Sequence, residues 1–137
     1  MARTLTHLNF SIKTRFGLVH QKMRIARLYL RLHQKFADIY EVIRPDFALI
    51  EGLIATTHGH YPTAYNLDKC VVPMDLLLGG PDPLAVDVVG AALMGFSLKE
   101  VKHLALRGEK GLGMADLKAI DMVNKKLFDE RKKSLSL

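Results

Sequence analysis

The segment with the most chemical potential runs from Gly80 to Asp87 and reads Gly-Pro-Asp-Pro-Leu-Ala-Val-Asp. Its first carboxylate, Asp82, precedes a proline, which is typical of a helix start, because aspartate accepts backbone N–H bonds and proline fits the first turn. The second carboxylate, Asp87, is the only polar side chain between Leu84 and Met94. A helix that is apolar on all sides is normally buried, and a buried carboxylate needs hydrogen bonds, a cation or a metal ion. Asp87 therefore either anchors the fold or belongs to a binding site.

A second candidate site is a pair of histidines, His58 and His60, in a loop predicted to follow a strand. Two imidazoles at this spacing could ligate a divalent transition metal such as zinc, nickel or iron, with Glu51 or an aspartate completing the ligand set. Loops at strand ends are also where α/β proteins bind ligands. Since two-histidine loops also occur without metal, an ordinary surface loop is the alternative interpretation.

Basic side chains are concentrated at the amino end of the chain, where residues 1–37 hold eight lysines and arginines and no acid. A basic stripe on a helix predicted over 20–44 consists of Arg24, Arg27, Arg31 and Lys35. Such a stripe can bind nucleic acid or an anionic surface. Only Tyr29 and Tyr40 add aromatic polar groups nearby, which favours a solvated helix face over nucleic-acid binding. The alternative function is a non-catalytic binding module whose basic helix binds nucleic acid or an acidic protein.

The elements that must position these residues alternate between helices and apolar strands. In chain order, the predicted elements are helices at 5–16 and 20–44, strands at 46–55 and within 70–78, helices at 82–94 and 97–107, and a strand at 120–123. Ser97 and Glu100 form a capping box at the start of the last helix. The charged tail, 125–137, is expected to fray. This order predicts an α/β fold with a parallel or mixed sheet packed with helices.

The length of 137 residues fits a single α/β domain over 1–137. No apolar run reaches the roughly 18 residues of a membrane-spanning helix, and the amino end lacks the apolar core of a signal peptide, so we expect a cytoplasmic protein. The single cysteine, Cys70, excludes an internal disulfide and an iron–sulfur cluster held by four thiolates of this chain alone. The segment that contains glycines 108, 111 and 113 lacks the lysine and hydroxyl residue that end a phosphate loop. These glycines are therefore interpreted as helix-terminating.

Several segments occur together in an order that is characteristic of one family. They are Ser11–Gly17, Arg44–Gly52, Asp82–Asp87, Met94–Gly95 and Gly111–Leu117. Over most of residues 5–124 the chain thereby resembles the domain-of-unknown-function family three-six-two, whose members are often associated with iron–sulfur centres. The Asp82–Asp87 string is the most specific part of this resemblance. The family usually has asparagine at the position of Thr14, aspartate at Glu51, and an acidic glycine-rich turn where Thr57–Pro62 stand.

The resemblance implies that the chain corresponds to the carboxyl-terminal part of a larger α/β domain. It also implies an iron–sulfur-associated context and a ferredoxin-type partner. We therefore expect a small ligand or metal ion to bind near Lys13, Glu51, His58, His60, Asp82 and Asp87, with Lys13 meeting an anionic ligand and the other side chains holding a cation. A partial domain leaves apolar surface uncovered, so a homo-oligomer or a complementing subunit is expected. No reaction is assigned.

Overall fold

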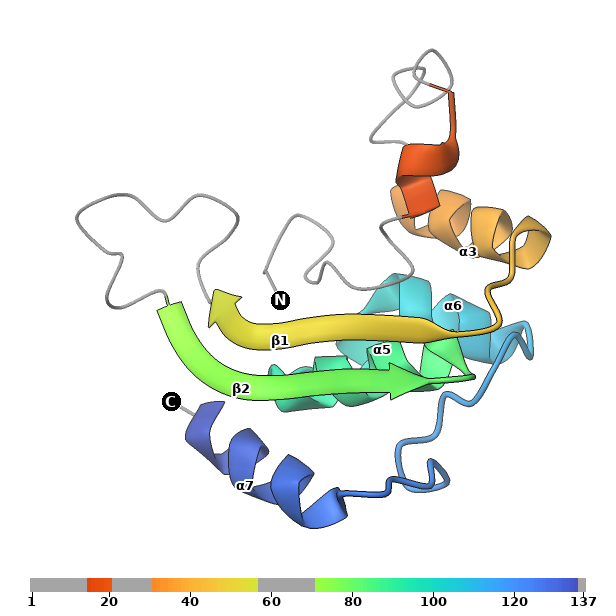
Figure 1. The fold of residues 1–137 in the computed structure, drawn as a ribbon. Helices are drawn as coiled ribbons and strands as arrows, with labels where there is room; N and C mark the ends of the chain where they lie inside the picture. Colours follow the sequence, from red (N-terminus) through yellow and green to blue (C-terminus); the bar gives the residue numbers. More distant parts are fainter. Residues whose placement is uncertain (1–14, 21–30, 57–70, 136–137) are drawn as a thin grey trace.

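Two antiparallel strands, β1 (Ala48–Thr56) and β2 (Val71–Gly80), form the sheet of this computed structural model, which describes residues 15–20, 31–56 and 71–135. Ala48 lies opposite Gly80 at one end, and Thr56 lies opposite Val71 at the other. Along β1, Ala48 and Ile50 are buried while Leu49 is exposed. This alternation is typical of an antiparallel sheet with one covered face. Figure 1 shows the two strands side by side and curving together.

The regular pairing is interrupted between Gly52 and Ile54. On the opposite strand, Pro73 has no backbone N–H to donate, and Asp75 adopts a left-handed conformation with φ 48°. The backbone N–H of Leu53 instead donates to the carboxylate of Glu51 on its own strand. An irregularity of this kind bends a strand and increases its twist.

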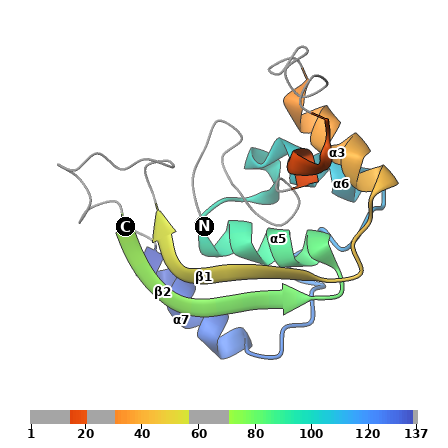
Figure 2. The ribbon, with the colours of Figure 1, turned by 45° about the horizontal axis from the view of Figure 1, so that its top comes forward.

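Helix α5 (Pro83–Leu93) covers one face of the sheet (Figures 1 and 2). Asp82 accepts hydrogen bonds from the backbone nitrogens of Leu84 at 2.9 Å and Ala85 at 3.1 Å, which confirms the predicted helix start. All residues of α5 except Ala85 are buried, because the helix contacts both strands and two further helices. Burial on all sides explains why this helix is apolar at nearly every position.

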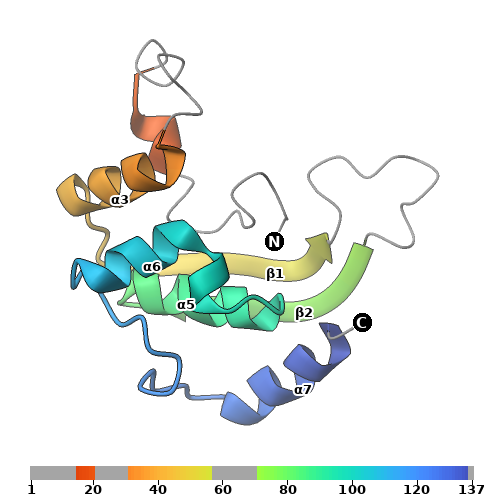
Figure 3. The same ribbon diagram turned by 180° about the vertical axis from the view of Figure 1, so that it is seen from behind.

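Of the remaining helices, α6 (Lys102–Glu109) packs directly against α5. Helix α3 (Leu32–Val42) packs against α6, and the two lie next to each other in Figure 3. One 3-10 turn, η1 (Arg15–Leu18), lies beside α3, and another, η3 (Leu98–Glu100), precedes α6. The predicted capping box is confirmed, because the side chains and backbone of Ser97 and Glu100 bond reciprocally. At the surface, Lys110 pairs with Asp38 at 3.1 Å and with Glu41 at 2.6 Å.

The α/β class is confirmed, and the strands that the structure describes run antiparallel. The predicted strand at 120–123 is wrong: this segment is irregular, although burial alternates along it as in a strand, with Ile120 and Met122 partly buried. Most of the tail forms helix α7 (Lys125–Leu135), whose Phe128 packs against the core. Within the described ranges, no helix is both long and apolar enough to span a membrane.

Candidate functional site

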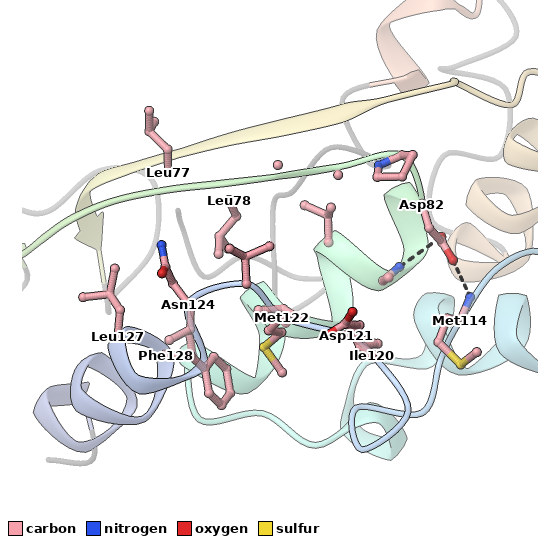
Figure 4. Close-up of a pocket in the computed structure, with 18 of the residues that line it drawn as sticks. Leu77, Leu78, Asp82, Met114, Ile120, Asp121, Met122, Asn124, Leu127 and Phe128 are labelled. Atoms are coloured by element: carbon pink, nitrogen blue, oxygen red, sulfur yellow. Dashed lines mark hydrogen bonds between the residues drawn. The ribbon is translucent and has the colours of Figure 1, made fainter.

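A pocket of about 590 Å³ lies between β2, α5 and the segment that leads into α7 (Figure 4). Most of its wall is apolar. The larger apolar residues that line it include Leu76, Leu78, Val86, Val89, Leu93, Met114, Ile120, Met122, Val123, Leu127 and Phe128. Its polar lining side chains are Asp82, Asp121 and Asn124. Small-molecule sites typically combine such an apolar wall with a few polar groups.

Asp82 lies at the edge of this pocket and fixes two parts of its wall to each other. Besides capping α5, its carboxylate accepts a hydrogen bond of 2.6 Å from the backbone nitrogen of Met114. The loop approaches so closely that a Cβ on Gly113, which has φ +150°, would lie 2.5 Å from Oδ1 of Asp82 and 2.8 Å from Cβ of Leu84. Residue 113 must therefore be glycine for the loop to dock on the start of α5.

Asp121 and Asn124 are the other two polar side chains of the pocket, and both are exposed. Within the part of the chain that the structure describes, neither side chain forms a hydrogen bond or an ion pair. Neither residue was predicted as a site residue: Asp121 was assigned to a strand at 120–123, and Asn124 directly follows that segment. The available signal was an acid inside a short apolar run directly before a helix.

A second arrangement of polar groups is buried between α3, α5 and α6. Arg107 is fully buried, and its Nη2 donates a 2.6 Å hydrogen bond to the backbone carbonyl of Phe36. Its guanidinium carbon lies 5.0 Å from the centre of the Tyr40 ring, within cation–π range. The Nε and Nη1 atoms have no hydrogen-bond partner among the described residues.

Arg107 interacts electrostatically with Asp87, the buried carboxylate of α5. Burial lowers the pKa of Arg107 to about 10, and the negative charge of Asp87 is the main influence that opposes this shift. Asp87 is itself fully buried. The buried charges of Asp87 on α5 and Arg107 on α6 therefore attract each other electrostatically.

Two histidines extend this buried group. The rings of His33 and His103 stack with centroids 5.7 Å apart, and Phe36 meets His103 edge-on at the same distance. His103 lies one helical turn before Arg107, so α6 turns both side chains toward α3. The sequence signal for this arrangement was the spacing of four residues between His103 and Arg107, next to the buried Leu104.

The residues predicted to form one site are not all brought together. Glu51 lies on the exposed face of the sheet, whereas Asp87 is buried in the helix that covers the opposite face. Arg31 is exposed at the start of α3, and Lys35 lies on α3 itself. The other predicted site residues lie outside the described residues: Lys13, Arg24, Arg27, His58 and His60. Within the described ranges, no group of three or more histidine, cysteine or acidic side chains could hold a metal ion.

Comparison with known families identifies the class of the protein. Residues 3–92 match the family model described as Domain of unknown function (DUF362). Because the match covers more than half of the chain, the protein belongs to this family, as the resemblance predicted. The matched region includes both strands and all of α5 except its last residue. No curated protein and no solved structure is significantly similar to the chain.

Proposed function

We propose that this domain binds a small organic ligand in the pocket between β2, α5 and α7. The observation that carries the proposal is a cavity of about 590 Å³ whose wall is mainly apolar. Ligand pockets of proteins fall in the range of roughly 300–1,000 Å³ and are mostly apolar. The docking of the Gly113 loop on Asp82 supports a preformed shape, because it holds one edge of the pocket against α5.

Fluorescence of the neutral apolar probe N-phenyl-1-naphthylamine tests this proposal. The probe should brighten and saturate with the wild-type protein. Ala119 lines the pocket from an exposed turn, so Ala119→Phe should fill part of the cavity and weaken probe binding at least tenfold. Lys126→Phe adds the same ring on α7 outside the pocket and should leave binding unchanged. Absence of binding, or equal binding by both variants, would contradict the proposal.

Metal binding remains a separate proposal and depends on His58 and His60. The iron–sulfur association and a ferredoxin-type partner are likewise proposals that follow from the family resemblance. The electrostatic attraction between Asp87 and Arg107 supports a structural role for that carboxylate in place of a metal-ligating one. We also propose that the protein is located in the cytoplasm.

Self-association, or a complementing subunit, is also proposed. The support is the outer face of the sheet, where Phe47, Leu49 and Leu77 are 59%, 64% and 63% exposed. Such exposed apolar patches commonly mark interfaces between proteins. Light scattering at micromolar concentration should give at least twice the mass of 15.4 kDa. A monomer would contradict self-association, and a monomer that also binds no other chain would contradict the complementing subunit.

A further inference from the structure

The pocket has a charge opposite to that of the chain as a whole. The protein carries a formal net charge of +6. By contrast, the described residues that line the pocket include two aspartates, Asp82 and Asp121, and no lysine, arginine or histidine. A cleft lined by one sign of charge raises the local concentration of ligands of the other sign. The pocket is therefore suited to a cation in a protein that would otherwise repel one.

The two carboxylates differ in how their oxygens are occupied. Asp82 accepts three backbone hydrogen bonds, from Leu84, Ala85 and Met114, so its oxygens are already engaged within the fold. Asp121 forms no hydrogen bond or ion pair with the residues that the structure describes. It is the carboxylate available to a ligand.

The backbone around Asp121 holds this carboxylate at the pocket. Its neighbours Ile120 and Met122 are partly buried and pack against the core, which fixes the segment between them. Figure 4 shows Asp121 with both neighbours among the lining residues, and Asn124 on the side of the pocket toward β2. The amide oxygen of Asn124 adds a second acceptor for a hydrogen-bond donor.

We infer that the ligand of this pocket is an amphipathic cation, with an apolar body packed between β2 and α5 and an ammonium group paired with Asp121. This inference rests on the proposed function, since it names the ligand class of the same pocket. The apolar wall binds the body by burial, and the charge of Asp121 selects the head group. The methionines Met114 and Met122 suit a body of variable shape, because methionine side chains adapt to irregular surfaces.

Three matched probes test the head group: 1-naphthylmethylamine, 1-naphthylmethanol and 1-naphthoate, which are cationic, neutral and anionic at pH 7. Each is titrated as a competitor of bound N-phenyl-1-naphthylamine. The amine should bind about tenfold more tightly than the alcohol, and the carboxylate should bind least. Added salt should reduce the preference for the amine, since the Asp121 side chain is exposed and its charge is screened.

The isosteric variant Asp121→Asn should lower the ratio of amine to alcohol affinity about tenfold. Asp129→Asn removes an exposed carboxylate of α7 outside the pocket and should leave that ratio unchanged. If the probes bind but Asp121→Asn retains the preference, or the amine has no advantage, the inference is wrong and the proposed function stands. If no probe binds, the proposed function fails first and the inference fails with it.

Discussion

Replacing Asp87 by asparagine removes a buried negative charge while keeping the shape of the side chain. Arg107 then remains fully buried without the main charge that opposes its desolvation. In the wild-type protein, burial already lowers the pKa of Arg107 to about 10. Because its pKa is lowered, the charged guanidinium of Arg107 destabilises the native state at neutral pH.

Removing one of two opposite buried charges typically costs about 3–5 kcal/mol, because the remaining charge stays uncompensated. We expect Asp87→Asn to lower the free energy of unfolding by this amount, a large part of the about 5–15 kcal/mol that stabilises a typical domain. Urea denaturation followed by circular dichroism measures the change as a shift of about 2 M in the midpoint, for a slope of about 2 kcal/mol/M.

A double-mutant cycle with Arg107→Met separates this charge pairing from other roles of Asp87. Methionine is unbranched like arginine and removes the buried charge, so the double variant should be more stable than the sum of the two single losses predicts. A loss below about 1 kcal/mol for Asp87→Asn, or additive losses in the cycle, would refute the reasoning that Asp87 stabilises the charge of Arg107.

Three further predictions follow from particular contacts. The pKa of Tyr40 is raised, chiefly by burial, which favours the neutral side chain in the folded protein. This contribution to stability is present below pH 10 and is lost as the pH rises through the pKa of the folded state. Alkaline denaturation of Tyr40→Phe should therefore depend less on pH above 10 than that of the wild type, and parallel profiles would contradict this. Gly113→Ala should destabilise by about 1–3 kcal/mol through the clash with Asp82, measured by urea denaturation, with Gly111→Ala, where no neighbouring atom lies within 4 Å, as the milder control. If His58 and His60 ligate a metal, elemental analysis should find it in the wild type and not in a double alanine variant; protein that neither retains nor takes up metal would exclude the site.

The sequence by itself determined the features that depend on neighbouring residues. The start of α5 was predictable because Asp82 bonds the nitrogens of residues two and three positions later. The Ser97–Glu100 capping box spans a similarly short interval. The burial of Asp87 followed from the apolar residues on all sides of its helix. The family was predictable because its motifs are short strings read in order.

Only the tertiary structure decided which distant groups meet. Arg107, whose charge interacts with that of Asp87, lies on α6, and the interaction depends on how α5 and α6 pack. The sequence predicted a parallel or mixed sheet because its strands are nearly continuous apolar runs, whereas the described strands pair antiparallel. The segment at 120–123 alternates like a strand, yet it packs its apolar side chains without a strand partner within the described residues. Asp121 lies in this segment and lines the pocket. Side-chain periodicity predicts on which face of a segment a residue lies, but only tertiary packing determines what that face contacts.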